Sequence, residues 1–441
     1  MNITGTSRRF GITAVQVGWL IRGGRIVDPV TGTEETSDIA VLNDRIVPRQ
    51  ELAGLPVREV DARGRVVVPG LIDLHVHFRE PGDEEAETVA SGARAAARGG
   101  FATVVLMPNT QPPADTPERI GAIAARAAAC RHVRALPAGC ITRGRSGKEL
   151  ADLAALASAG AVAFTDDGTT PGDTALLHRA MEIARDLGVP ILDHALDPVA
   201  AARGVMHAGA RSAALKLPGI PAEAEVCMVK RDIELCEKTG CRVHIQHVSC
   251  AESVALVRQA RAAGLRVSAE VTPHHLALTD EMVVPTDANF KMLPPLRTEK
   301  DRAALLEAVA EGTVSALASD HAPHRAAEKA RGFLAAPPGV VGLETAVGVT
   351  YTLLVRAGRM SLMEWLRRWT TGPAEILGHE LPSLRPGALA DFCVLDLENE
   401  WIVQPQTFLS KSRNTPFGGW RLIGRAVCTF HAGIMTWSEQ S

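Results

Sequence analysis

Short apolar runs alternate with alanine-rich amphipathic segments through the middle of the chain, from about residue 71 to residue 378. Each apolar run is short enough to be a buried strand, whereas the segments between them have helical periodicity. The eight strand candidates are LIDLHVH (71–77), FATVVLMPNT (101–110), VRALPAGCIT (133–142), AVAFTDDG (161–168), VPILDHA (189–195), CRVHIQHVS (241–249), RVSAEVTPHH (266–275) and VSALASDHAPH (314–324).

The intervening segments end where a helix would be expected to stop. Examples are EEAETVASGARAAARGG (84–100), PERIGAIAARAAACRH (117–132), GKELADLAALASAGA (147–161) and DTALLHRAMEIARDLG (173–188). Glycine or a polar residue often stands at their ends, as is typical of helix termini. Eight strands separated by helices predict an α/β fold, a TIM-like (β/α)8 barrel.

The two ends of the chain have a different pattern. Runs such as WLIRGGRIVD (19–28) and FCVLDLENEWIV (392–403) are typical of strands, and Gly, Asn-Asp or Pro breaks separate them. Neither end has enough strands for a stable core. We therefore predict one small β-domain built from both ends, with residues 1–69 and 381–441 flanking a barrel of residues 70–380.

Two long insertions interrupt the predicted barrel, at residues 197–221 after the fifth strand and 325–342 after the eighth. The second is rich in alanine, glycine and proline. A loop there would lie over the mouth of the barrel and could act as a lid, and a passive surface loop is the alternative.

Composition limits the class of protein. The 441 residues are 46% hydrophobic and 22% charged with a net charge of −3, which indicates a globular protein that binds neither nucleic acid nor acidic membranes. No apolar run reaches the roughly 18 residues of a membrane span. The apolar stretch after Arg8 and Arg9 is short and broken by glutamine, so we expect no signal peptide. Eight cysteines without a CxxC pair favour a reducing, cytoplasmic setting over a disulfide framework or a thiolate zinc site.

Metal-capable side chains occupy the carboxyl ends of five predicted strands. They are His75, His77, Asp167, His194, His247 and Asp320. His75 and His77 are two residues apart, so in a strand their side chains point the same way. A lone histidine at a strand end is usually only hydrogen-bonded, and Asp166–Asp167 before Gly168 could form a turn. Since barrel active sites lie at this end of the strands, the six together predict a metal centre.

The ligand types indicate which metal and which chemistry. Four imidazoles and two carboxylates suit borderline divalent metals, zinc first. Six ligands are more than one catalytic zinc requires, whereas two zinc ions that share a bridging carboxylate and a bridging hydroxide would use them all. Zinc lowers the pKa of bound water to about 7, so the sequence predicts metal-assisted hydrolysis.

Several segments are similar to those of a known family. They are DLHVHFREP (73–81), MPNT (107–110), FTDDG (164–168), VTPHHL (271–276), PPLR (294–297), ASDHAPHRAAEK (318–329), VGLET (341–345) and NTPF (414–417). In their order and spacing they resemble the bacterial class I dihydroorotases of the amidohydrolase superfamily, over nearly the whole chain.

The resemblance implies how the ligands are shared. His75 and His77 would hold the first zinc together with Asp320, Asp167 would bridge, and His194 and His247 would hold the second. Asp167 is preferred to Asp166 because its spacing to His194 fits. Hydantoinases, dihydropyrimidinases and the other dihydroorotase class bridge their metals with a carboxylated lysine. The fourth predicted strand, AVAFTDDG, contains no lysine, which argues against those relatives.

The resemblance also implies the reaction, a reversible interconversion of N-carbamoyl-L-aspartate and L-dihydroorotate in pyrimidine synthesis. Asp320 would act as general base and then as general acid. Arg79 would bind the substrate carboxylate with its planar fork. An ion pair of Arg79 with Glu80 or Asp83 is the structural alternative.

The substrate pocket matches the family only in part. The resemblance implies substrate contacts at His77, Arg79, Asn109, Leu293, His324, Pro338 and Gly339. Leu293 stands where the family carries asparagine, and Pro338 where it carries an aromatic residue, at a position whose backbone contacts substrate. A lost amide contact implies weaker activity, a compensating contact or a different cyclic amide. His274 and His275 are interpreted as structural, and six further histidines as surface or core residues: His132, His178, His207, His244, His379 and His431.

Three functions remain open on these observations. The leading one is a zinc dihydroorotase that forms homo-oligomers and could associate with aspartate transcarbamoylase. The second is a hydrolase of a hydantoin or another cyclic ureide, which Leu293 favours. The third is a non-catalytic scaffold partner of aspartate transcarbamoylase, and the presence of all six predicted ligands argues against it.

Overall fold

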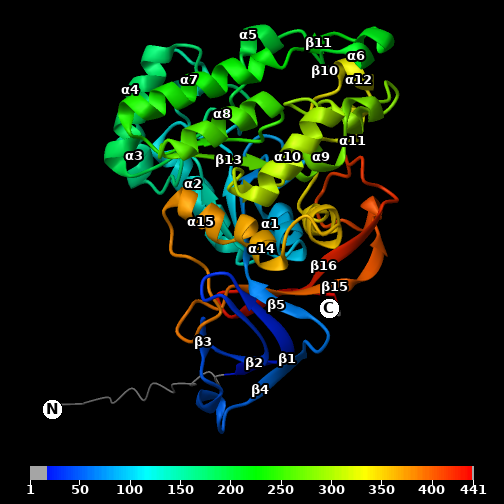
Figure 1. Ribbon diagram of the computed structural model, residues 1–441. Helices are drawn as coiled ribbons and strands as arrows, with labels where there is room; N and C mark the ends of the chain where they lie inside the picture. The colour runs from blue at the N-terminus through cyan, green and yellow to red at the C-terminus, as the bar shows by residue number, and fades with distance from the viewer. Residues whose placement is uncertain (1–16, 440–441) are drawn as a thin grey trace, which may run out of the picture.

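Parallel strands form the wall of a closed barrel in the computed structural model, which describes residues 17–439 (Figure 1). The strands are β6 (Leu71–Val76), β7 (Phe101–Leu106), β8 (Arg134–Pro137), β9 (Ile191–Asp193), β12 (Val243–Ile245), β13 (Val267–Val271) and β14 (Ala316–Leu317). They pair in the orders β6-β7-β8 and β9-β12-β13-β14. Phe164 bridges Gly139 and Ile191, and His321 bridges Val76. These bridges close the barrel and confirm the predicted fold class.

The fourth strand is reduced to the bridge at Phe164, although the sequence predicts a strand over 161–168. The backbone of residues 162–165 still bonds both neighbouring strands, since the N–H of Thr165 donates to the carbonyl of Gly139 at 2.9 Å and that of Phe164 to the carbonyl of Pro190 at 3.0 Å. Beyond residue 165, polar side chains bind backbone groups instead. The backbone N–H of Asp167 donates to Thr165 Oγ1 at 3.0 Å, and that of Thr142 donates to Asp166 Oδ1 at 3.1 Å. Such bonds compete with regular sheet pairing, so the strand ends before residue 168.

Helices surround the barrel and connect successive strands. They are α1 (Val89–Arg98), α2 (Pro117–Cys130), α3 (Leu153–Ser158), α4 (Thr174–Leu187), α7 (Glu223–Thr239), α8 (Ala251–Ala262), α10 (Glu299–Glu311), α14 (Leu362–Trp369) and α15 (Thr371–Leu377). Thr88 caps α1 in a capping box with Ser91. Gly188 and Gly240 end α4 and α7 in the left-handed conformation, with φ of 69° and 70°. The sequence signals for these helix ends therefore have their usual structural meaning.

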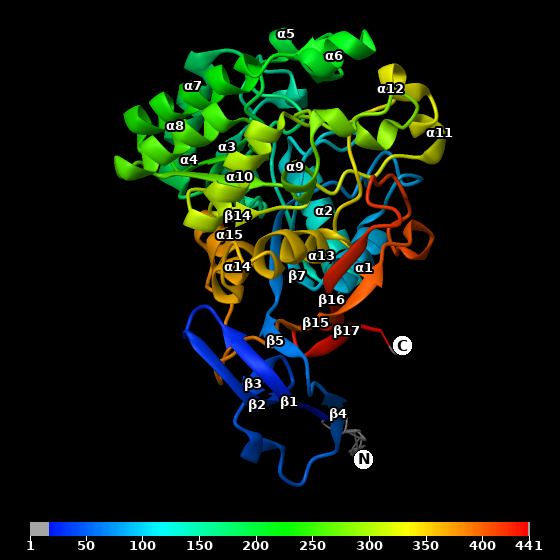
Figure 2. The same ribbon diagram turned by 45° about the vertical axis from the view of Figure 1, so that its right-hand side comes forward.

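The two ends of the chain share one sheet beside the barrel. Its strands are β1 (Gly18–Asp28), β2 (Thr33–Leu42), β3 (Arg45–Val47), β4 (Val57–Asp61), β5 (Val66–Pro69), β15 (Phe392–Ile402), β16 (Arg421–His431) and β17 (Ile434–Ser438). The order is β17-β16-β15-β5-β1-β2-β3, and β4 also pairs with β1. In Figures 1 and 2 the blue N-terminal strands meet the orange and red C-terminal strands at β5. The antiparallel pairing of β5 with β15 thus joins the two ends, as predicted.

Both insertions carry short elements of their own. Residues 197–221 contain α5 (Pro198–Ala201), β10 (Met206–His207), α6 (Ala210–Leu215) and β11 (Gly219–Ile220), and residues 325–342 contain α11 (Ala326–Lys329) and α12 (Gly332–Ala335). The Lys329 ammonium donates to the carbonyls of Ala288 and Pro337 at 2.9 and 3.0 Å. Phe333 is buried in an apolar cluster with Met292. The second insertion is therefore packed against the barrel rather than lying loosely over it.

The remaining short elements are α9 (Pro273–Ala277), α13 (Ala346–Thr350), a π-helical turn (Tyr351–Arg356) and five 3-10 turns, Arg49–Leu52, Arg143–Arg145, Asp280–Met282, Ala288–Phe290 and Pro405–Thr407. Within residues 17–439, none of the helices has the length and apolarity that crossing a bilayer requires. The signal-peptide prediction falls mostly on residues 1–16, outside the described residues.

Candidate metal centre and active site

Two histidines at the end of β6 face carboxylates from other strands. His75 Nε2 lies 3.1 Å from Asp167 Oδ1 and 3.6 Å from Asp320 Oδ1. His77 Nε2 lies 3.2 Å from Asp320 Oδ1. The alternation of side chains along a strand therefore points both imidazoles to one place, as predicted.

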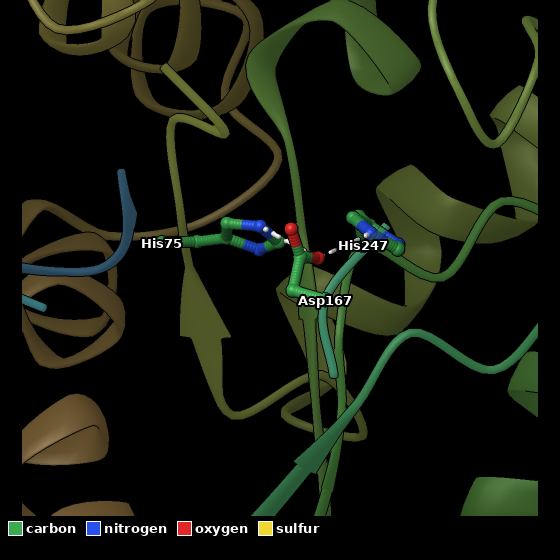
Figure 3. Close-up of side chains that lie close together, drawn as sticks. All are labelled: His75, Asp167 and His247. Atoms are coloured by element: carbon green, nitrogen blue, oxygen red, sulfur yellow. Dashed lines mark ion pairs between the residues drawn. The ribbon is translucent and has the colours of Figure 1, made fainter. Parts of the chain in front are cut away.

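Asp167 lies between this pair and two further histidines. Its Oδ1 is 3.5 Å from His194 Nδ1 and 3.8 Å from His247 Nε2, and those two nitrogens are 2.9 Å apart. Figure 3 shows the Asp167 carboxylate between the rings of His75 and His247. The structure thus brings all six predicted metal ligands together around Asp167. Five of them form two groups close enough to hold an ion, His75–Asp167–His247 and His75–His77–Asp320, which share His75.

The cluster is buried and contains polar atoms without hydrogen bonds. All six side chains belong to residues no more than 6% exposed. Within the described part of the chain, His75 Nε2, Asp167 Oδ1, His194 Nε2 and His247 Nδ1 have no hydrogen-bond partner. Unpaired buried imidazole nitrogens and carboxylate oxygens are costly unless a cation binds them. These residues therefore fit a divalent metal centre.

Electrostatics keeps the two carboxylates and His194 in the forms that bind metals. Burial raises the pKa of the Asp167 carboxyl, but the facing imidazoles of His75, His194 and His247 outweigh it and hold that pKa well below its usual value. For Asp320, burial is likewise outweighed by His75 and His77, and the pKa is lowered. Burial lowers the pKa of His194. Ionised carboxylates beside a neutral imidazole are suitable ligands for zinc.

The acidic neighbours of two of these residues face away. Asp166 accepts hydrogen bonds from the backbone and the hydroxyl of Thr142. Asp193 accepts from the hydroxyl of Thr170 at 2.8 Å and from Arg231 at 3.0 Å. Asp167, rather than Asp166, therefore faces the histidines, in the arrangement that the family spacing suggests.

Backbone strain accumulates at this site. His247 and Asp320 have φ of 31° and 44°, and Arg79 has φ of 58°. A non-glycine residue in this region costs on the order of 1–3 kcal/mol and persists only where its surroundings enforce it. Three such residues around one cluster indicate that side-chain placement takes precedence over local backbone preference.

A buried glutamate that the sequence analysis did not select supports His75. Glu270 Oε1 accepts from His75 Nδ1 at 2.8 Å, and its Oε2 lies 3.0 Å from His244 Nε2. Burial would raise the pKa of Glu270, but the bonds to His244 and His75 lower it to about 2. A carboxylate that holds the far nitrogen of a histidine fixes its metal-facing nitrogen. A charged residue inside the apolar strand VSAEV was the available sequence signal.

A cavity of about 230 Å³ opens beside the cluster. Its lining includes every residue predicted to contact substrate: His77, Arg79, Asn109, Leu293, His324, Pro338 and Gly339. Lysine is absent from the lining residues of this cavity within residues 17–439. The cavity therefore combines the candidate metal centre with the predicted substrate pocket.

Arg79 is available for a ligand in this cavity. Its Nε donates to the carbonyl of Pro323 at 3.1 Å. Among the described residues, no carboxylate forms an ion pair with it. Glu80 pairs instead with Arg126 at 3.4 Å, and Asp83 with Arg325 at 3.7 Å. The ion pair considered as the alternative for Arg79 is therefore not formed.

The other polar groups of the pocket are largely engaged with the protein. Asn109 Oδ1 accepts from His77 Nδ1 at 2.9 Å, so Asn109 lines the cavity and also orients the imidazole of His77, a predicted metal ligand. His324 Nε2 donates to the carbonyl of Pro338 at 2.7 Å. The N–H of Gly339 donates to the carbonyl of Lys291 at 2.8 Å, and proline has none. Backbone N–H groups of residues 338–339 are thus not directed into the cavity.

Leu293 and the paired histidines complete the pocket's surroundings. Leu293 packs against an apolar cluster that contains Leu196 and Ile220. His275 contacts Thr272 Oγ1 at 2.7 Å and donates to the carbonyl of Pro294 at 3.0 Å, which fits the structural role predicted for it. His274 is buried as well, and its Nε2 has no partner among the described residues.

Comparisons with known proteins agree on one family. The model of a family described as "Dihydro-orotase-like" matches residues 64–253. A dihydroorotase of Pelotomaculum thermopropionicum is 48% identical over 425 residues, which cover 96% of this chain and 99% of that protein. A dihydroorotase of Anaeromyxobacter dehalogenans is 46% identical over 423 residues, which cover 95% of this chain and 98% of that protein.

Solved structures with the same fold are less similar in sequence. An L-hydantoinase (dihydropyrimidinase) of Arthrobacter aurescens has a TM-score of 0.84 at 25% identity, and a dihydropyrimidinase of Brevibacillus agri has 0.82 at 22%. Each comparison covers 96% of both chains. These neighbours confirm the fold over nearly the whole chain, barrel and adjoining sheet together.

Proposed function

The chain belongs to the dihydroorotase family, and we propose from this that it interconverts N-carbamoyl-L-aspartate and L-dihydroorotate reversibly. It is thus a cyclic-amide hydrolase in the hydrolytic direction. The observation that carries the proposal is the meeting of six candidate metal ligands at one cavity with a half-buried arginine that forms no ion pair among the described residues. The six metal ligands suit the hydrolysis of an amide, and the arginine suits a substrate that carries a carboxylate.

We propose that the site holds two zinc ions. His75, His77 and Asp320 would hold one, His194 and His247 the other, with Asp167 as the bridge. Zinc at this place supplies polarisation of the ring carbonyl and lowers the pKa of water to about 7. Glu270 and Asn109 fix two of the imidazoles by binding their Nδ1 atoms, at 2.8 and 2.9 Å.

Asp320 is the proposed general base and acid. Its lowered pKa leaves the carboxylate ionised at neutral pH, so it can take a proton from the attacking water. It then delivers this proton to the departing ring nitrogen. Arg79 would hold the substrate carboxylate bidentately, since its Nε is already bound to Pro323 and, within the part of the chain that the structure describes, its outer nitrogens make only one long contact, from Nη2 to His324 Nε2 at 3.4 Å.

The bacterial class I assignment within the family is supported by the bridge position. Asp167, a carboxylate, lies between the two groups of ligands. A carboxylated lysine would require a lysine there, and the described cavity lining has none. The similarity to hydantoinases and dihydropyrimidinases supports the fold and does not extend to this feature.

The remaining parts of the proposal concern the cellular setting. We propose a cytoplasmic enzyme, because its eight cysteines are all free and six of them are buried. Homo-oligomers and association with aspartate transcarbamoylase belong to the same proposal, on the family resemblance. A purely scaffolding role is disfavoured because a chain without catalysis has no need of a strained, buried ligand cluster.

The test is hydrolysis of L-dihydroorotate by the purified, zinc-loaded protein, alone and with its aspartate transcarbamoylase. Dihydrouracil and hydantoin serve as rings without the carboxylate, and bound zinc is measured in parallel. We expect about two zinc ions per chain and turnover of dihydroorotate that exceeds turnover of either control ring. Turnover of a control ring alone would assign a different substrate, as Leu293 suggests. Stoichiometric zinc without any turnover would support the scaffold function.

A further inference from the structure

We propose that Asn414 is a positioning residue that fixes the carboxylate-binding arginine of this site. The inference rests on the proposed function, because it concerns how Arg79 recognises a carboxylated ring. Asn414 lies in the C-terminal segment between the Pro405–Thr407 turn and β16, far in sequence from the barrel loops that it contacts. Nothing in its local sequence, NTPF, indicates that contact.

The Asn414 carboxamide uses all of its principal hydrogen-bonding directions on two loops. Its Oδ1 accepts from the backbone N–H of His324 at 3.0 Å. Its Nδ2 donates to the carbonyls of Ala322 and Gly339, both at 3.0 Å. Ala322, His324 and Gly339 all line the candidate substrate cavity. One buried side chain, 5% exposed, therefore fixes three parts of the cavity wall.

Asn414 acts on Arg79 through Pro323, because it forms hydrogen bonds to the residues on either side of Pro323. Ala322 and His324 are the two neighbours of Pro323, and the carbonyl of Pro323 accepts from Arg79 Nε at 3.1 Å. Because Asn414 holds the segment at both ends, it fixes the direction of the carbonyl in the middle. That carbonyl orients the Arg79 guanidinium together with His324, whose Nε2 lies 3.4 Å from Arg79 Nη2 and whose backbone N–H is bound by Asn414. The direction of the outer nitrogens of Arg79 follows from these contacts.

The backbone around Asn414 is held by contacts that do not need its carboxamide. Glu344 accepts from the N–H groups of Leu409 and Ser410 at 2.9 and 3.1 Å. Ser412 Oγ donates to the carbonyl of Ala86 at 2.7 Å, and the N–H of Val341 donates to the Asn414 carbonyl at 2.9 Å. Truncation of the Asn414 side chain should therefore leave the segment in place and release only the loops.

The first test is a double-mutant cycle of Asn414→Ala with Arg79→Gln, measured by steady-state hydrolysis of dihydroorotate. We expect Asn414→Ala to raise KM about 10-fold with kcat within about 3-fold, since a few neutral hydrogen bonds are lost. In the Arg79→Gln background the same substitution should change KM less than about 2-fold, because its effect passes through Arg79. If Asn414→Ala raises KM by the same factor in the parent protein and in the Arg79→Gln background, the proposal is overturned.

Ser412→Ala is the matched control, because it removes a buried hydrogen bond that the same segment makes to Ala86 and leaves its bonds to residues 322–324 and Gly339 intact. We expect its KM and kcat to remain close to those of the parent protein. A KM increase equal to that of Asn414→Ala would show that any loosening of the segment suffices, which contradicts the specific role. Zinc content and circular dichroism verify that each variant is folded and loaded.

A measurement without substrate separates this inference from the proposed function. Hydrogen exchange of the His324 amide should be faster in Asn414→Ala and unchanged in Ser412→Ala. If the parent protein does not hydrolyse dihydroorotate, the proposed function is wrong. The exchange rate of the His324 amide still shows in that case whether the Asn414 side chain protects this N–H group. An unchanged His324 exchange rate in Asn414→Ala would overturn the inference even in an active enzyme.

Discussion

The two walls of the active-site cavity are built in different ways. The metal-side wall, defined by His75, His77, Asp167, His194, His247 and Asp320, comes from the ends of barrel strands. The loop-side wall, defined by Arg79, Leu293, His324, Pro338 and Gly339, comes from segments between regular elements. The strands place side chains by their own periodicity, whereas the loops need support from elsewhere in the chain.

This difference separates two kinds of function within one cavity. Residues of the metal-side wall face one another at 2.9–3.8 Å and are supported from below by Glu270. Residues of the loop-side wall contact one another through His324, which bonds the Pro338 carbonyl at 2.7 Å and lies 3.4 Å from Arg79. Their segments also depend on Asn414 and Lys329. We therefore expect substitutions in the first wall to reduce kcat or metal binding and those in the second to raise KM.

The largest expected effect is that of Asp320→Asn, which removes the proposed proton carrier while keeping the size of the side chain. General acid–base catalysis contributes about 10²–10⁴-fold, so kcat should fall by roughly that factor. Steady-state kinetics with a parallel zinc assay measures it. Asp83→Asn is the control and should stay near the parent rate, because this carboxylate lies outside the cavity lining and, within residues 17–439, pairs with Arg325 alone. If the variant binds two zinc ions and keeps at least about a tenth of the parent kcat, Asp320 is not the proton carrier of the reaction.

The next effect sharpens the assignment of the loop-side wall. Arg79→Lys keeps the charge but loses the planar fork, and a charged contact of this kind contributes about 2–5 kcal/mol to binding. We expect KM for dihydroorotate to rise about 100-fold, with much smaller changes in kcat and zinc content. A lysine variant with an unchanged KM would mean that Arg79 does not bind the carboxylate.

The same two walls show how far the sequence alone could lead. The strand-end ligand candidates stand out because each follows an apolar run at a fixed place, and the closed barrel brings such ends together. Glu270 was overlooked because a single acid inside an apolar strand carries no spacing pattern with His75, which is 195 residues away. The NTPF segment was recognised as family-like, but the role of Asn414 was not, since its partners are set by the pairing of β5 with β15 and by the path of the C-terminal segment.

Local side-chain chemistry explains the other differences. The predicted strand over 161–168 pairs with its neighbours only as far as residue 165, because beyond it the side chains of Thr165 and Asp166 bind backbone groups. The predicted loop at 325–342 contains two short helices because Lys329 and Phe333 are buried against the barrel. Both outcomes depend on tertiary contacts, which periodicity does not encode.

A smaller effect tests the support of the metal-side wall. Glu270→Gln removes the carboxylate that binds His75 and His244, and loss of such an outer partner typically costs 10–100-fold in metal affinity. We therefore expect a competing chelator to remove zinc from this variant at a concentration about 10–100-fold lower than from the parent protein. Ser268→Ala, which affects only the far side of His244, is the control. Parent-like zinc affinity in Glu270→Gln would show that the metal-side wall does not depend on its outer partners.

The smallest expected effect concerns Leu293, where the family carries asparagine. Leu293 packs against the cluster of Leu196 and Ile220, so Leu293→Asn replaces an apolar contact by a polar group that lacks an obvious partner on that side. If the pocket of this chain is adapted to leucine, KM for dihydroorotate should change less than about 3-fold, and stability should fall by about 1–3 kcal/mol. Kinetics and thermal unfolding measure the two quantities. If KM for dihydroorotate falls more than about 10-fold in Leu293→Asn, this substrate binds better when the side chain at position 293 is an amide. The loop-side wall would then be specific for another ring, while the metal-side wall keeps the chemistry that both rings share.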